Sequence, residues 1–140
     1  MKINKILVPV DGSEHSLKAA QYAADLANLC RAEIMLLHCH RAFPKILGEP
    51  YFQNAVTKTL NESNELLEPY RKLLVDMKTT FIDRVLEGPA GHTIPEVARI
   101  ESCDLIVMGS RGLSDLEGLL LGSVAHRVLH AASVPVLIVR

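Results

Sequence analysis

Five short apolar runs, separated by longer segments with helical periodicity, are the feature that most limits how this chain can fold. Each run is too short and too evenly apolar to be an exposed helix. Such runs are typical of strands that are buried on both faces of a parallel sheet. We therefore expect strands at residues 6–10, 33–39, 79–86, 104–108 and 134–139.

The segments between these runs carry apolar side chains every three or four residues, which predicts helices over 13–29, 56–77, 92–102 and 122–130. Ser13 is a suitable N-cap for the first helix. Pro69 is expected to kink or divide the second helix, and Pro95 is acceptable only in the first turn of the third. Residues 41–50, rich in proline and glycine, are expected to form a loop.

Strands that alternate with helices indicate right-handed crossovers and a parallel sheet covered on both faces. The predicted fold class is therefore α/β, with a doubly wound, five-stranded parallel sheet. The length of 140 residues suits one domain, so residues 1–140 are expected to form a single unit. Periodicity gives the alternation of elements but not the order of the strands in the sheet.

Composition excludes several classes of protein. The net charge is −1, from 15 basic and 16 acidic residues, so a nucleic-acid partner is not expected. With 49% hydrophobic residues the chain is not disordered, and no apolar run is long enough to predict membrane insertion. Three cysteines without a C-x-x-C motif favour a reducing, cytoplasmic location, and Cys30 and Cys103 are expected to be buried.

Polar and glycine residues follow the predicted strands at the edge where α/β sheets bind ligands. Asp11 follows the first strand, and Cys39 ends the second. The fourth strand is followed by Gly109-Ser110-Arg111-Gly112, and Gly122-Ser123-Val124 opens the last helix. Together the last two segments give the pattern G-x2-G-x9-G-S. This edge is the predicted ligand site.

This glycine pattern suits a phosphate group. Glycines allow a ligand to approach the backbone closely, and the free N–H groups at the start of a helix favour an anion. The Ser123 hydroxyl is a further donor, and Arg111 could add positive charge. The alternative is that these glycines serve only turns and a helix cap. Neither a Walker lysine nor a G-x-G-x-x-G motif is present in the corresponding segments.

Taken together, these segments resemble the universal stress protein family along nearly the whole chain. The resemblance rests on Lys5 to Ser13, Leu36-Leu37-His38, Gly88-Pro89-Ala90, Asp104 to Gly112, Leu120 to Val124, and Pro135 to Val139. It implies a Rossmann-like sheet, similar to the adenine nucleotide alpha hydrolases, with strand order 3-2-1-4-5. It also implies a homodimer formed through the last strand, which begins at Val134 and ends at Val139.

In the subset of that family with the complete glycine pattern, the resemblance implies ATP binding. The phosphates and ribose would be held by backbone N–H groups and the Ser123 hydroxyl. Asp11 would face the ribose or a water bound to Mg²⁺. The backbone of Pro9 and Cys39 would line the adenine pocket, where cysteine replaces the family's usual small apolar residue. The implied phosphate and ribose residues are Gly109, Arg111, Gly112, Gly122, Ser123 and Val124, and Ser110 is also expected in the binding site.

The favoured function is an ATP-binding regulatory or stress-response module with slow or no hydrolysis and an unidentified protein partner. The alternatives are a dimeric scaffold that binds no nucleotide, or a weak ATPase. An efficient phosphoryl-transfer enzyme is disfavoured because the expected site offers no general base and no pair of acids. Asp115 and Glu117 are interpreted as solvated residues, although they would lie near the triphosphate, where Mg²⁺ could relieve the repulsion.

Overall fold

The computed structural model describes residues 1–43, 48–113 and 115–140. Its parallel sheet has the order β3-β2-β1-β4-β5, as expected from the resemblance. The strands are β1 (Lys5–Pro9), β2 (Glu33–His40), β3 (Phe81–Glu87), β4 (Leu105–Gly109) and β5 (Val136–Val139). The helices are α1 (Glu14–Cys30), α2 (Tyr51–Asp76), α3 (Ala90–Ile100) and α4 (Ser123–Ala131). The predicted α/β fold class is confirmed.

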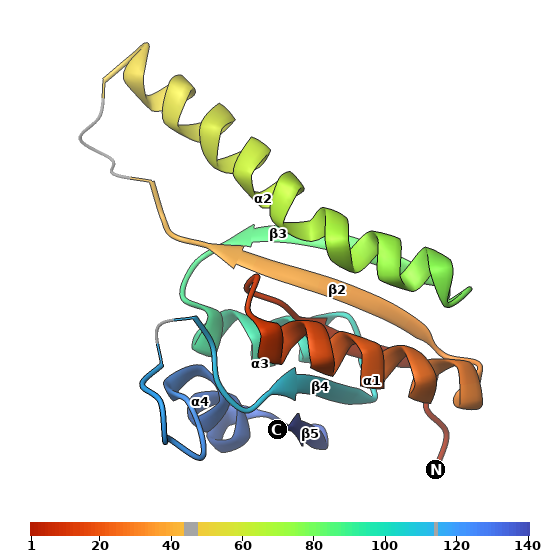
Figure 1. Cartoon of the computed structure of the whole chain (residues 1–140). Helices are drawn as coiled ribbons and strands as arrows, with labels where there is room; N and C mark the ends of the chain where they lie inside the picture. The colour runs from red at the N-terminus through yellow and green to blue at the C-terminus, as the bar shows by residue number, and fades with distance from the viewer. Residues whose placement is uncertain (44–47, 114) are drawn as a thin grey trace.

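Helices cover both faces of the sheet (Figure 1), and each face has its own hydrophobic cluster. On one face, α1 and α2 pack against alternate side chains of β1, β2 and β4, such as Ile6 and Leu36. On the other face, α3 and α4 pack against the intervening side chains, such as Leu7 and Leu37. Because both faces of the central strands are buried, those strands consist of continuous apolar runs.

The first helix begins as the sequence predicts. Ser13 is its N-cap, and the Ser13 hydroxyl accepts a hydrogen bond from the Ser16 backbone N–H at 3.1 Å. A stripe of small side chains faces the sheet and is fully buried, which brings α1 close to the strands. This stripe consists of Ala19, Ala20, Ala23, Ala24 and Ala27.

The predictions that Pro69 divides its helix and that Pro95 lies in the first turn of its helix are wrong. α2 continues through Pro69 as one helix, because buried Leu67, Tyr70 and Leu74 hold the chain on both sides of the proline against the sheet. α3 begins at Ala90, earlier than predicted, so Pro95 lies beyond its first turn. A helical proline removes one backbone donor, and packing of the surrounding helix can offset that loss.

Other expectations have mixed outcomes. Cys103 is buried, but Cys30 is exposed at the end of α1. Part of the predicted loop, residues 44–47, and Ser114 in the segment after β4 lie outside the described residues. Among the described helices, none is both long enough and apolar enough to cross a membrane.

Candidate functional site

A pocket opens at the carboxyl edge of the sheet, where β1 and β4 leave in opposite directions to their crossover helices. Reversal of strand order at this point separates the two connecting segments and leaves a crevice between them. The hollow holds about 110 Å³ and is partly open to solvent.

Most of the residues predicted to form a site line this pocket. They are Pro9, Asp11, Cys39, Gly109, Arg111, Gly112, Ser123 and Val124. Ser110 and Gly122 are not among the lining residues, and both are buried. The Ser110 N–H donates to the Val139 carbonyl at 2.9 Å, and its own carbonyl accepts from the Gly122 N–H at 2.6 Å. These two residues join β4, β5 and the start of α4.

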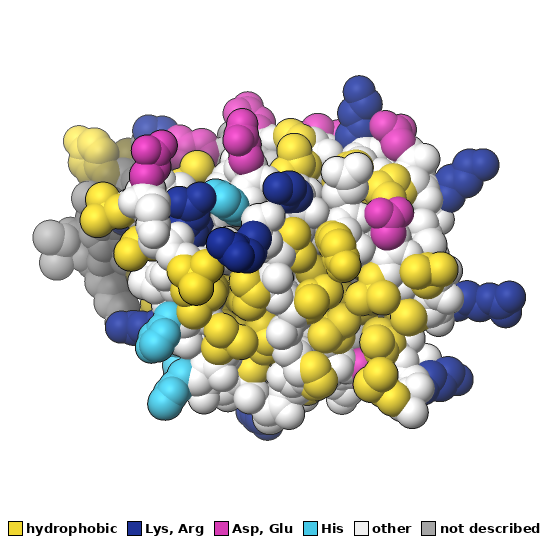
Figure 2. Space-filling model, turned by 60° about the horizontal axis from the view of Figure 1, so that its bottom comes forward, with side chains coloured by type: hydrophobic (Ala, Val, Ile, Leu, Met, Phe, Trp, Pro, Cys, Tyr) yellow, Lys and Arg dark blue, Asp and Glu magenta, His cyan; other side chains and the backbone are white. Residues whose placement is uncertain are grey.

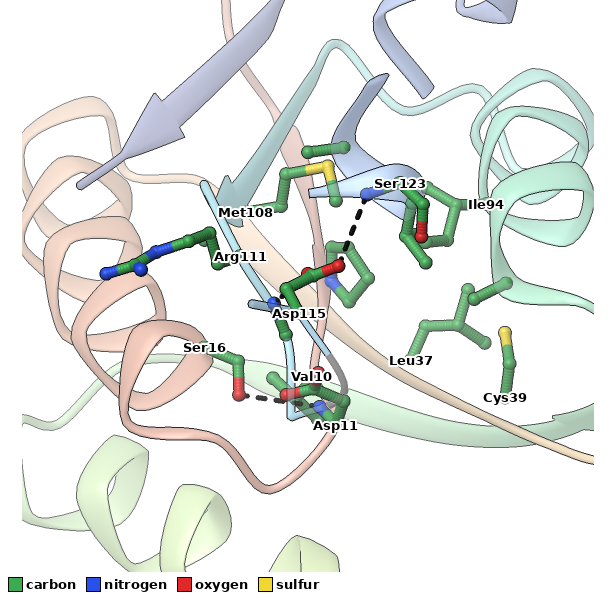
Figure 3. A pocket seen from close by; sticks show the side chains of 16 residues that line it. Val10, Asp11, Ser16, Leu37, Cys39, Ile94, Met108, Arg111, Asp115 and Ser123 are labelled. Carbon is green, nitrogen blue, oxygen red and sulfur yellow. Dashed lines mark hydrogen bonds between the residues drawn. The ribbon is translucent and has the colours of Figure 1, made fainter. Parts of the chain in front are cut away.

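One end of the pocket is apolar, and the sequence analysis did not identify it. Its side chains come from β2, β4, α3 and α4, and Figure 3 shows Leu37, Cys39 and Ile94 grouped together. In a sequence, such residues cannot be distinguished from ordinary core positions. The apolar residues that were missed are Val10, Leu37, Ala90, Ile94, Met108 and Ala125.

The other end of the pocket contains backbone N–H groups. Helix α4 starts here, so the N–H groups of Ser123, Val124 and Ala125 belong to its first turn. The Gly112 N–H lies opposite and donates to the Asp115 Oδ2 atom at 2.6 Å. The Asp115 Oδ1 atom accepts from the Ser123 N–H at 3.4 Å (Figure 3). Asp115 is therefore bound between the two parts of the glycine pattern and is not simply solvated.

Asp11 ties the β1–α1 turn to the segment after β4. Its Oδ1 atom accepts from the Ser13 N–H at 3.0 Å, and its Oδ2 atom accepts from the Leu113 N–H at 3.3 Å. A Cβ atom at Gly112 would lie 2.5 Å from the Asp11 Oδ2 atom. Glycine at position 112 therefore allows the two segments to approach each other. The polar end of the pocket is thus bordered by two carboxylates, those of Asp11 and Asp115.

The side chains of Arg111 and Cys39 also line the pocket. The guanidinium group of Arg111 points away from Leu37 and Cys39 (Figure 3). Burial raises the pKa of the Cys39 thiol to about 11, partly offset by a hydrogen bond with the Thr93 side chain. At neutral pH this cysteine is therefore a neutral thiol and contributes an apolar surface.

Tyr70 of α2 holds the turn that carries Asp11, an arrangement that local sequence patterns do not reveal. The Gly12 N–H donates to the Tyr70 hydroxyl at 3.0 Å. The Ser16 hydroxyl donates to the Ser13 carbonyl at 3.0 Å, so the Tyr70 hydroxyl is the donor in its 2.5 Å contact with the Ser16 Oγ atom. Burial raises the pKa of Tyr70, which keeps this donor protonated.

Tyr70→Phe is expected to lower the free energy of unfolding by about 1–3 kcal/mol, because it leaves the Gly12 N–H without its partner. Urea unfolding followed by circular dichroism would measure the loss. Tyr22→Phe is the matched control, since Tyr22 is 55% exposed and should tolerate loss of its hydroxyl. Equal stability of Tyr70→Phe and the wild type would contradict the assigned hydrogen-bond network.

Strand order 3-2-1-4-5 and a pocket at the point of reversal define a Rossmann-like α/β protein, similar to the adenine nucleotide alpha hydrolases. The model of the universal stress protein family matches residues 2–140. The chain belongs to the universal stress protein family.

Individual relatives match over almost the whole chain. A universal stress protein of Thermus aquaticus is 34% identical over 135 residues, which cover 96% of this chain and 97% of that protein. The solved structure of MJ0577 from Methanocaldococcus jannaschii is 30% identical, with a TM-score of 0.88, and the match covers 99% of this chain and 96% of that one. A universal stress protein solved in complex with cAMP is 26% identical, with a TM-score of 0.73 and coverage of 100% and 98%.

Proposed function

We propose that this protein is an ATP-binding regulatory or stress-response module, acting as one domain over residues 1–140. The proposal rests on one observation. A single pocket has an apolar end and, at its other end, backbone N–H donors at the start of α4. An apolar slot suits a purine base, and N–H groups at a helix start suit phosphate. The relative that was solved with cAMP supports an adenine nucleotide as the ligand.

Adenine recognition is proposed to use the backbone of Cys39. In a parallel sheet, backbone groups of alternate residues face the same neighbouring strand. The Leu37 carbonyl faces β1 and accepts from the Val10 N–H at 2.8 Å, whereas the His40 carbonyl faces β3 and accepts from the Gly88 N–H at 3.0 Å. The Cys39 N–H and carbonyl therefore face the β1 side, beyond the last β1 residue, Pro9. One donor and one acceptor so placed can pair with an adenine edge.

Mg²⁺ is proposed to accompany the nucleotide. Asp11 and Asp115 border the polar end of the pocket, and both would repel a triphosphate. Carboxylates and phosphates are the oxygen ligands that Mg²⁺ prefers, usually with retained waters. The residues therefore fit a metal that is held between the nucleotide and Asp11 through water. The ion would neutralise part of the phosphate charge.

Hydrolysis is proposed to be slow or absent. The charged residues that line the pocket, among those described, are Asp11, Arg111 and Asp115. The Asp11 carboxylate already accepts hydrogen bonds from the backbone N–H groups of Ser13 and Leu113. A carboxylate engaged in this way is a poor general base for an attacking water. A regulatory role, with bound nucleotide altering a surface that a protein partner recognises, fits this arrangement better than turnover does.

The decisive experiment is to denature freshly purified protein, identify any released nucleotide by chromatography, and titrate the nucleotide-free protein with ATP and Mg²⁺ by calorimetry. We expect saturable binding of ATP and no linear, multi-cycle release of phosphate. Absence of binding at millimolar ATP would overturn the proposal in favour of a nucleotide-independent scaffold. Sustained turnover would instead favour the ATPase.

We also propose a homodimer formed by antiparallel pairing of two β5 strands. β5 pairs with β4 on one side, and its four residues are only half-buried. Figure 2 brings forward the end of the molecule that holds β5 and shows hydrophobic side chains gathered across it. An uncovered apolar edge strand promotes aggregation, and pairing about a two-fold axis would cover it.

The proposed location is the cytoplasm, where the three free cysteines would remain reduced.

Sedimentation equilibrium is expected to give twice the chain mass of 15.4 kDa. The carbonyls of Pro135 and Val139 accept hydrogen bonds from β4, so the intervening N–H of Ile138 faces the free edge. Ile138→Pro should therefore yield a folded monomer, whereas Leu137→Pro should disturb pairing with β4 and destabilise the fold. A monomeric wild type, or a dimeric Ile138→Pro, would contradict this interface.

A further inference from the structure

The Asp115 side chain occupies the position that suits a ligand's anion. Its carboxylate reaches across the pocket between Gly112 and Ser123 and accepts a backbone N–H from each, at 2.6 and 3.4 Å (Figure 3). These two donors come from the two halves of the glycine pattern. They are also the groups that a phosphate at this end of the pocket would need. A carboxylate bound by backbone N–H groups at a helix start is chemically close to a bound phosphate.

The space around Gly122 supports the same interpretation. A Cβ atom at position 122 would overlap the Asp115 Oδ2 atom and would lie 2.7 Å from the Asp115 Cγ atom. Gly122 has φ −77° and ψ 170°, a conformation that any residue adopts, so glycine is not required there by the backbone. What requires glycine in this structure is the space that the Asp115 carboxylate fills. A ligand phosphate cannot enter that space while Asp115 remains.

We propose that Asp115 is a built-in competitor of the ligand's phosphate, which sets the affinity and selectivity of the pocket. In the unliganded protein its carboxylate satisfies the N–H groups of Gly112 and Ser123. A nucleotide binds only when its phosphate displaces that carboxylate, and the Asp115 side chain, which is half-exposed, then turns toward solvent. Nucleosides, which lack a phosphate, use the apolar end alone and do not compete with Asp115. This inference rests on the proposed nucleotide-binding function.

The test compares Asp115→Ala, Asp115→Asn and Glu117→Ala with the wild type. Glu117 lies in the same loop, carries the same charge and is exposed, so it controls for the general loss of a negative charge. Calorimetry with ATP and Mg²⁺, with ATP in EDTA, and with adenosine measures each affinity. We expect Asp115→Ala to bind ATP about tenfold more tightly with or without Mg²⁺, since the carboxylate's two hydrogen bonds, one of them long at 3.4 Å, no longer have to be broken. Asp115→Asn should be intermediate, and adenosine affinity should be unchanged.

A second readout uses no nucleotide. Thermal unfolding of unliganded Asp115→Ala should begin at a lower temperature than that of the wild type or Glu117→Ala, because the Gly112 and Ser123 N–H groups lose their acceptor.

The possible contrary results are distinguishable. If the wild type binds ATP and Asp115→Ala binds it equally or more weakly, this inference fails while the proposed function stands. Weaker binding only when Mg²⁺ is present would assign Asp115 to the metal and overturn its role as competitor. If neither protein binds nucleotide, both the proposed function and this inference fail.

Discussion

Gly122→Val is expected to weaken ATP binding by at least about 100-fold while the protein remains folded. The backbone at position 122 tolerates a side chain, and the Gly122 N–H would still donate to the Ser110 carbonyl. The valine side chain, however, would fill the space at the start of α4 that Asp115 now occupies. A phosphate would then lose its contacts with the N–H groups of Gly112 and Ser123. Loss of two charge-assisted hydrogen bonds accounts for the expected factor.

Calorimetry with ATP and Mg²⁺ measures this effect, and Gly48→Val is the matched control. Among the described residues, a Cβ atom at Gly48 would meet no atom within 4 Å, so the same substitution there should change neither affinity nor stability. The double variant Gly122→Val with Asp115→Ala separates two causes of lost binding. It removes the overlap with the carboxylate but keeps the valine, so it should remain unable to bind ATP. Wild-type affinity in Gly122→Val would mean that nucleotide binds elsewhere or that the protein is a scaffold.

The elements of the fold were predictable because each one has a local cause. A continuous apolar run such as 6–10 is fully buried only in a sheet that is covered on both faces. Ser13 has the short polar side chain that caps the start of α1. The ends of helices were less predictable because tertiary packing decides them. Pro69 and Pro95 both lie inside helices, where the packing of neighbouring side chains outweighs one missing backbone donor.

The polar end of the pocket could be predicted in part because glycines and acids at strand ends are conspicuous in a sequence. Asp115 was misjudged because its two hydrogen bonds depend on how the segment after β4 turns back toward α4. The spacing of residues in the sequence does not show that this segment turns back toward α4. The apolar end was missed for a different reason. Ile94 and Met108 have the side chains of ordinary core residues, and only the divergence of the chain after β1 and β4 opens a pocket beside them.

Tyr70 is the clearest case of information that is absent from local sequence. It lies on α2, 58 residues from Gly12, yet its hydroxyl accepts the Gly12 N–H. A tyrosine on an apolar helical stripe predicts only burial. The contact exists because α2 crosses beside α1 and brings Tyr70 to the β1–α1 turn (Figure 1). Residues that hold a binding loop from another element can be recognised only once that packing is known.

Gly109→Val is expected to lower the free energy of unfolding by about 3 kcal/mol or more, a larger effect on stability than that of Gly122→Val. A Cβ atom at Gly109 would lie 2.9 Å from the backbone carbonyl carbon of His15 and 3.0 Å from its oxygen. Those atoms belong to the first turn of α1, which packs closely on the sheet through its alanine stripe. The overlap can be relieved only by moving the helix, which would open the core between α1 and β4.

Valine substitutions at Gly122 and Gly109, two glycines of one pattern, should therefore have different effects: the first on ATP binding and the second on stability. At Gly122 the obstructing atoms belong to the Asp115 side chain, which can turn away, so folding survives and binding is lost. At Gly109 they include main-chain atoms, so His15→Gly should not restore the stability of Gly109→Val. Urea unfolding should show the midpoint of Gly109→Val lowered by about 1–3 M, for a slope of about 1–3 kcal/mol per molar. Gly48→Val serves again as the control, and an unchanged midpoint for Gly109→Val would mean that α1 does not pack against β4 this closely.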